Sequence, residues 1–152
     1  MRRIQFACGG NKLEGWENYD TDCNLDNLPL PFPDDCADMI FIEHALEHFA
    51  GDHFLKLLEE FRRILKPGGV LRVCVPVIGV HLKRNHCHDL IVGHGHKVML
   101  DRNIAVTAFW AAGYELPDIQ ITGRKETDSH WRVIGKELDD TESLRIEARK
   151  SK

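Results

Sequence analysis

The sequence predicts a single α/β domain built on a mostly parallel sheet. Apolar segments recur along the chain, one amphipathic helix separates two of them, and a proline-glycine signal ends that helix. A chain of 152 residues with 43% apolar and 29% charged residues has the length and composition of one globular domain with one core. We therefore interpret residues 1–152 as one domain.

Four strands are predicted in the first half of the chain. The segment ADMIFIE is a continuous apolar run, which is typical of a parallel strand buried on both faces. RIQFA, WENYD and GVLRVCVP are interpreted as three further strands. In chain order, the predicted strands cover residues 3–7, 16–20, 37–43 and 69–76.

One amphipathic helix is predicted between the last two of these strands, within residues 51–69. Apolar side chains recur there at spacings of three and four residues, and charged side chains occupy the opposite face. The helix should stop at residues 66–69 (KPGG), because proline cannot continue it and glycine tolerates positive φ. A strand, helix and strand in this order predict a right-handed parallel unit.

A glycine pair and two acids follow the first predicted strand. Ligands of parallel sheets bind at the carboxyl ends of the strands, where Gly9, Gly10 and Asp20 fall. Glycines allow a close approach of backbone N–H groups, and a carboxylate can accept hydrogen bonds from the hydroxyls of a ribose. This spacing is also compatible with a simple turn, so by itself it leaves both interpretations open.

Three longer segments support the ligand interpretation. ACGGNKLEGWENYDTD, LDNLPLPFPDDCADMIFIEHALEHF and LLEEFRRILKPGGVLRVCVP resemble the class I S-adenosylmethionine-dependent methyltransferases, and specifically the methyltransferase-11-like group. The resemblance is close over residues 3–76 and looser over residues 96–115 and 143–150. It implies a Rossmann-like three-layer sandwich with strand order 3-2-1-4-5-7-6, strand 7 antiparallel, and S-adenosylmethionine as cofactor.

The resemblance also implies roles for individual residues. The glycine-rich loop under the methionine part of the cofactor would be formed by Ala7, Cys8, Gly9 and Gly10. Asp20 would hold the ribose, and Asp22 is the alternative because the strand boundary is uncertain by about two residues. The remaining assignments are Asp26 to the adenine amino group, Asn27 and Leu28 to the adenine ring, and Glu43 and His44 to the region beside the sulfonium.

The chain departs from the family pattern in length. Only nine residues separate Gly10 from Asp20, whereas the usual loop and helix take about twenty. We therefore expect no full helix there. We also expect a minimal version of the fold that lacks the N-terminal helices, which would favour self-association or a large acceptor that docks from outside.

The expected activity is methyl transfer to an unidentified acceptor, a small molecule or glycan with a hydroxyl or amine group. Positioning should supply most of the acceleration, and His44 or His96 could act as base for a hydroxyl. We expect Glu47 and His48 to cap or pack a helical turn.

The competing interpretation is a non-catalytic subunit that binds S-adenosylmethionine or a nucleotide. A nicotinamide enzyme is disfavoured because the glycines do not form G-x-G-x-x-G.

A histidine-rich segment raises the question of metal binding. Five of the nine histidines fall within residues 81–96, together with Cys87 and Asp89. Because no spacing there matches a recognised zinc pattern, we expect a substrate-lining or exposed loop and no metal.

Charge and cysteine usage restrict partners and location. A net charge of −4 with scattered basic residues argues against a general nucleic-acid surface. Five cysteines without C-x-x-C spacing fit a reducing compartment. No segment has the length of a signal-peptide core or a membrane span, so we expect a cytoplasmic protein without membrane contact.

Overall fold

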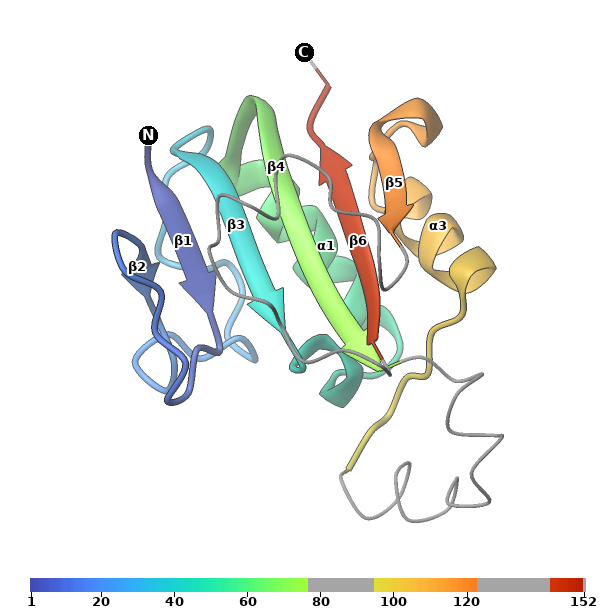
Figure 1. The fold of residues 1–152 in the computed structure, drawn as a ribbon, viewed down its shortest axis with the longest axis horizontal. Coiled ribbons are helices and arrows are strands. Elements are labelled where there is room, and N and C mark those ends of the chain that lie inside the picture. Colours follow the sequence, from blue (N-terminus) through green and yellow to red (C-terminus); the bar gives the residue numbers. More distant parts are fainter. Residues whose placement is uncertain (77–94, 123–142, 152) are drawn as a thin grey trace.

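The computed structural model of the chain describes residues 1–76, 95–122 and 143–151. These residues form one six-stranded sheet in the order β2-β1-β3-β4-β6-β5 (Figure 1). In chain order the strands are β1 (Arg3–Phe6), β2 (Glu17–Asn18), β3 (Ala37–Glu43), β4 (Leu65–Pro76), β5 (Ile119–Thr122) and β6 (Ser143–Arg149). The helices are α1 (Asp52–Ile64) and α3 (Arg102–Ala111), and the short 3-10 turns are η1 (Leu46–His48) and η3 (Leu116–Asp118).

The strand directions confirm the α/β class. β2, β1, β3 and β4 are parallel to their neighbours, whereas β6 runs antiparallel to both β4 and β5. The observed order reproduces the expected 2-1-4-5-7-6 part of the sheet and differs in one detail. Residues 19–36 contain no strand, so β2 is the edge of the described sheet. Pro29, Pro31 and Pro33 lie in this segment, and proline lacks the N–H that a paired strand needs.

The element boundaries differ from the predicted ones mainly at the end of α1. β3 spans the predicted residues 37–43, and β1 and β2 are shorter than predicted. Helix α1 ends at Ile64, before the KPGG motif, and these four residues belong to the start of β4. Gly69 is required there, because a Cβ atom would lie 2.9 Å from the carbonyl oxygen of Lys66.

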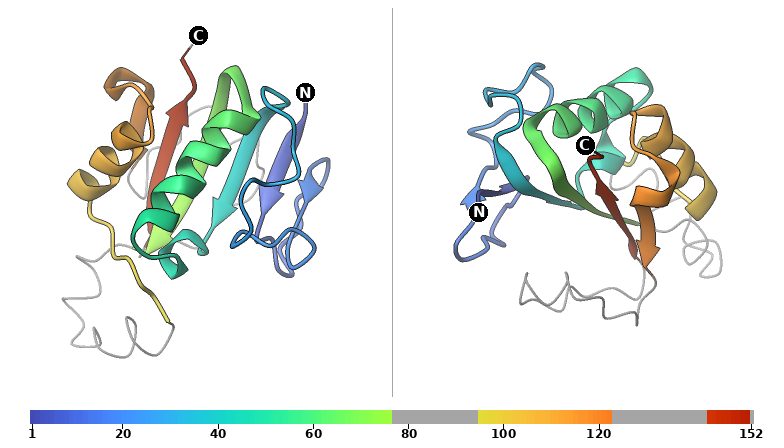
Figure 2. Two further views of the ribbon diagram at one scale, coloured as in Figure 1. Left: turned by 180° about the vertical axis from the view of Figure 1, so that it is seen from behind. Right: turned by 90° about the horizontal axis from the view of Figure 1, so that it is seen from above.

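The core lies between the sheet and two helices that cover the same face (Figure 2). Helix α1 buries the side chains of Phe54, Leu57, Leu58 and Phe61. The strands contribute alternate apolar residues to this layer, among them Ile4, Phe6, Ile40, Ile42, Leu71, Val73 and Ile146. None of the described helices is long and apolar enough to cross a membrane.

The opposite face of the sheet is covered differently in the described part of the chain. Instead of a helix, the turn segment after β1 places Leu13 and Trp16 against Met39 and Phe41, and all four are buried. The Gln5 side chain holds this segment, since its oxygen accepts from Leu13 N at 3.1 Å and its nitrogen donates to Asn11 O at 3.0 Å. The nine residues before Asp20 thus cover the sheet without forming a helix.

The proline-rich segment is fastened to α1 by Glu60. This carboxylate is only 8% exposed and accepts a hydrogen bond from Leu30 N at 2.7 Å. Arg63 donates to the same carboxylate at 2.6 and 2.9 Å, and it also donates to Phe32 O at 2.9 Å. Leu30 and Phe32 are thereby held in the core beside Phe6, whose ring centroid lies 5.5 Å from that of Phe32.

We predict that Glu60→Ala destabilises the protein at neutral pH by about 1–3 kcal/mol, because Leu30 N and Arg63 lose a charged acceptor. The matched control is Glu59→Ala, which alters an exposed residue of the same helix and should change stability by less than about 0.5 kcal/mol. Urea unfolding of the three proteins measures both differences. Equal destabilisation by the two substitutions would contradict the assigned role.

The stabilisation by Glu60 should also depend on pH. Hydrogen bonding to Arg63 lowers the pKa of Glu60 below its ordinary value near 4.5. The charged form is therefore favoured in the folded state, so the stabilisation is present above pH 4.5 and is lost as the pH falls through the lower folded-state pKa. We expect wild type and Glu60→Gln to converge in stability at acidic pH in urea unfolding experiments.

Candidate functional site

A cavity of about 440 Å³ opens at the carboxyl ends of β1, β2 and β3. Figure 1 shows the arrowheads of β1, β3 and β4 at the same edge of the sheet. The volume falls in the range of small-molecule sites. Residues from three connecting segments form the wall of this cavity: Ala7, Asp20, Thr21, Cys23, Asn24, Leu25, His44, Ala45, His48 and Phe49.

The turn after β1 forms one side of the cavity. Ala7 lies on the cavity wall and has a φ of 52°, and Gly9 has a φ of 49°. Positive φ is uncommon for a residue with a side chain and is often found at functional sites. No atom lies within 4 Å of a Cβ built at Gly9 or Gly10, so the space beside both glycines is open. The backbone N–H of the buried Cys8 donates to Tyr19 O at 3.1 Å, which joins this turn to the segment after β2.

The two candidate ribose acids occupy different places. Asp20 is exposed and lies on the cavity wall, and its Oδ1 accepts from Gly9 N at 3.3 Å. Asp22 does not belong to the wall. Its Oδ1 accepts from Asp20 N at 2.7 Å, so the side chain of Asp22 holds the backbone of Asp20 in place.

The residues expected around the adenine ring lie beside the cavity. Asp26 and Asn27 are exposed and Leu28 is half-buried, and none of the three belongs to the cavity wall. Their neighbours Asn24 and Leu25 do belong to it. Asn24 Oδ1 accepts from Asp26 N at 2.9 Å, so these residues form one connected turn. The sequence interpretation did not single out Asn24 or Leu25.

His44 lies directly after β3, on the other side of the cavity. Its φ is 48°, and its backbone N–H donates to Cys74 O at 2.9 Å. Its ring lies between two partners, with Nδ1 3.6 Å from Glu47 Oε1 and Nε2 3.1 Å from Ser143 Oγ. The Glu47 carboxylate raises the pKa of His44 above its ordinary value, and burial of the ring opposes this shift.

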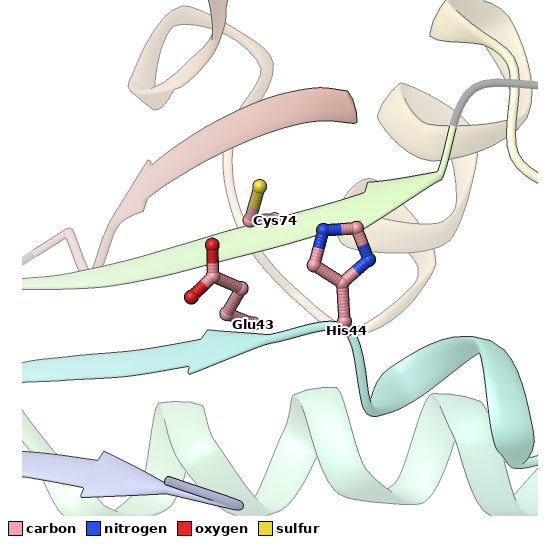
Figure 3. Close-up of side chains that lie close together, drawn as sticks. All are labelled: Glu43, His44 and Cys74. Atoms are coloured by element: carbon pink, nitrogen blue, oxygen red, sulfur yellow. The ribbon is translucent and has the colours of Figure 1, made fainter. Parts of the chain in front are cut away.

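Glu43, His44 and Cys74 gather where β3 and β4 run side by side (Figure 3). Their potential ligand atoms lie within 4.8 Å of one another. Burial raises the pKa of Cys74 to about 12, so this side chain is a neutral thiol at physiological pH. Glu43 and Cys74 do not belong to the cavity wall, whereas His44 does.

His96 is the second candidate base, and its ring and that of His44 both face the carboxylate of Glu47. Glu47 is 2% exposed, and its Oε1 lies 3.6 Å from His44 Nδ1 and 3.9 Å from His96 Nε2. The His48 and His96 rings are 5.0 Å apart between centroids. Glu47 and His48 lie in the turn η1, where Glu47 is packed as expected, and the structure also places both residues beside His96. The repeat EHALEH, with pairs four residues apart, is the signal that could have identified them.

The other members of the histidine-rich segment lie outside the described residues. These are His81, His86, Cys87, His88, Asp89 and His94.

Comparisons with known proteins agree with this geometry. The methyltransferase-domain family model matches residues 12–73. No curated protein matches the chain. Among solved structures, an S-adenosylmethionine-dependent methyltransferase from Archaeoglobus fulgidus has a TM-score of 0.62 at 16% identity, covering 98% of this chain and 86% of that one. A second such enzyme, from Mesorhizobium loti, has a TM-score of 0.62 at 14% identity, covering 97% and 90%.

A third solved structure is a Haloferax volcanii protein in complex with the Trm112 methyltransferase activator. Its TM-score is 0.62 at 15% identity, covering 99% of this chain and 83% of that one. At identities this low, the structural similarity shows a shared fold and no more. The match to the methyltransferase-domain family covers 62 of the 152 residues, which is less than half of the chain. The family-model match over residues 12–73 and the shared fold together support a class I, S-adenosylmethionine-dependent methyltransferase of the methyltransferase-11 group.

Proposed function

We propose that this protein transfers a methyl group from S-adenosylmethionine to a small molecule or a glycan that offers a hydroxyl or amine group. The observation that carries the proposal is the cavity at the strand ends, which has Asp20 and the glycine turn on one side and His44 on the other. When bound, the cofactor supplies an electrophilic methyl group on a sulfonium. The residues of the chain hold the reactants in line, which is the main source of acceleration in such a displacement.

The cofactor side of the cavity has the donors and acceptors that a nucleoside requires. The carboxylate of Asp20 is exposed and can accept hydrogen bonds from both ribose hydroxyls. The open space at Gly9 and Gly10 allows a ligand to approach the backbone closely. Leu25 adds an apolar surface to the same wall. These features fit the cofactor that the family uses.

The acceptor side has a chain of hydroxyl, imidazole and carboxylate groups. Because Glu47 Oε1 faces Nδ1 of His44, we assign the ring proton to Nδ1, which leaves Nε2 as a proton acceptor. The Ser143 hydroxyl at 3.1 Å shows that a hydroxyl group can reach Nε2 at hydrogen-bonding distance. We propose that an acceptor hydroxyl takes the same position and gives its proton to His44.

We predict that Asp20→Ala weakens the binding of both S-adenosylmethionine and S-adenosylhomocysteine by about 1.5–3 kcal/mol, because charge-assisted hydrogen bonds to the ribose are lost. Asp22→Ala should have a smaller effect, since Asp22 acts by holding Asp20. Titration calorimetry measures both affinities. The opposite ranking would transfer the ribose role to Asp22, and a wild type that binds neither ligand would exclude the proposed function.

We predict that His44→Ala lowers turnover of a hydroxyl acceptor by about 100-fold or more at nearly unchanged cofactor affinity, since general-base assistance contributes about 10²–10⁴. Ser143→Ala is the control, because it removes a neighbour of the ring and leaves the base intact. Initial rates together with calorimetry separate the two effects. Full activity in His44→Ala would show that positioning alone suffices or that His96 is the base.

The acceptor class can be identified by following S-adenosylhomocysteine formation with pools of sugars, lipids, small acids and RNA. We expect product with a small-molecule or glycan pool and none with RNA. The competing proposal, a non-catalytic subunit, stays open, because one structural neighbour forms a complex with a methyltransferase activator. Tight cofactor binding without turnover in any pool would favour that alternative.

A further inference from the structure

We propose that Glu47, His48 and His96 bind a divalent transition-metal ion, such as Zn²⁺, beside the cofactor cavity. One carboxylate oxygen and one ring nitrogen from each histidine lie within 4.8 Å of one another. Imidazole and carboxylate groups are established ligands of Zn²⁺. The proposal goes beyond methyl transfer and does not depend on it.

The buried carboxylate of Glu47 is the first observation that supports a cation here. A buried anion is costly unless positive charge or hydrogen bonds balance it. Its Oε2 has no hydrogen-bond partner among the residues that the structure describes. Near Oε1 the structure records the imidazoles of His44 and His96, at 3.6 and 3.9 Å, which carry a positive charge only when protonated. A metal ion would supply a permanent positive charge at this position.

The orientation of His48 is the second observation. Its Nδ1 lies 3.3 Å from the carbonyl oxygen of Gly95, so Nδ1 carries the proton that it donates. Nε2 then has its lone pair available for a metal. Histidine ligands of metal ions usually donate their second ring nitrogen to a backbone carbonyl or a carboxylate, which fixes both tautomer and ring orientation. The contact with Gly95 fulfils this condition.

The backbone holds the two ligand-bearing segments together. The carbonyl oxygen of Glu47 accepts from Lys97 N at 2.7 Å and from Val98 N at 3.1 Å. These bonds place the residue before Lys97, which is His96, against the turn η1 that carries Glu47 and His48. The site is thus built mainly by hydrogen bonds that do not involve the ligand side chains.

The distances are close to those of a bound ion. Ligand atoms about 2.1 Å from a tetrahedral zinc ion lie about 3.4 Å from each other. His96 Nε2 and Glu47 Oε1 are 3.9 Å apart, so a shift of about half an ångström would complete that edge of the site. Three protein ligands leave one position for water or an acceptor oxygen. His48 also lies on the cavity wall, so the ion would be close to the acceptor.

The neighbouring group of Glu43, His44 and Cys74 is the less suitable alternative. A metal prefers the thiolate form of cysteine, and burial keeps Cys74 in the thiol form. Carboxylate and imidazole ligands bind a metal without the loss of a thiol proton.

The test uses the full chain, freed of metal by a chelator, and titrated with Zn²⁺ in a non-chelating buffer. We expect one Zn²⁺ per chain by calorimetry and elemental analysis. We also expect Co²⁺ to give the visible absorption of a site with nitrogen and oxygen ligands. Glu47→Gln and His96→Ala should each weaken binding by at least about 100-fold, since even outer-shell partners of a metal contribute 10–100-fold. If His96→Ala does not fold, His96→Gln replaces it.

Three controls locate the ion. His53→Ala, Cys74→Ala and the double variant His86→Ala with His88→Ala should keep stoichiometric zinc. Unchanged zinc affinity in both Glu47→Gln and His96→Ala would overturn the proposal. Loss of zinc in Cys74→Ala or in the double variant, with zinc retained in Glu47→Gln and His96→Ala, would overturn it as well. Cofactor affinity measured in the same samples distinguishes this result from a failure of the proposed function. We expect His96→Ala to lose zinc and to retain S-adenosylmethionine.

Discussion

The site depends on the pairing of β3 between β1 and β4. The parallel register aligns Phe6 with Ile42, and Glu43 with Cys74, so the strands end near the same edge of the sheet. At this edge the chain turns away through positive φ angles at Ala7 and His44. Both residues are rigidly placed, because buried strands precede them. The strain of these two turns is therefore supported by the core and opens the space in which a ligand can bind.

Glu47 connects the two halves of the acceptor side. Its carboxylate faces the imidazoles of both His44 and His96, and its backbone carbonyl receives the N–H groups of residues 97 and 98. One buried acid thus orients a candidate base and organises a candidate metal site. Its burial makes the electrostatic interactions with both rings stronger than they would be in water. A change at Glu47 should affect both features together.

The short connection between β1 and Asp20 changes how the fold is completed. In nine residues the chain cannot form the usual helix, and it instead uses Leu13 and Trp16 to cover Met39 and Phe41. The hydrogen bond from Gly9 N to Asp20 Oδ1 closes this short path directly over the strand ends. The proline-rich segment after Asp20 then packs on α1 through Glu60 rather than adding a strand to the sheet.

The sequence by itself determined the elements whose signals are local. The apolar run of residues 37–43 predicted β3 to the residue, and the spacing of apolar residues in α1 predicted the face that is buried. The glycines and acids after β1, taken together with the family resemblance, predicted a ligand site at the strand ends, and the structure has a cavity there. The spacing of apolar residues and the residue types of turns are patterns that extend over a few residues, so they can be recognised in the sequence without knowledge of the fold.

Only the tertiary structure decided which distant side chains meet. Ser143 lies beside His44 across 99 residues of sequence, and Gly95 contacts His48 across 47. No periodic pattern connects such positions, because their distance is set by strand register and by loops packed on the core. The same reason explains why Asn24 and Leu25, rather than Asp26 and Asn27, line the cavity. An irregular turn of a few residues can place either pair on the cavity wall. Which pair lies there depends on the hydrogen bonds of the turn and on its packing in the folded chain.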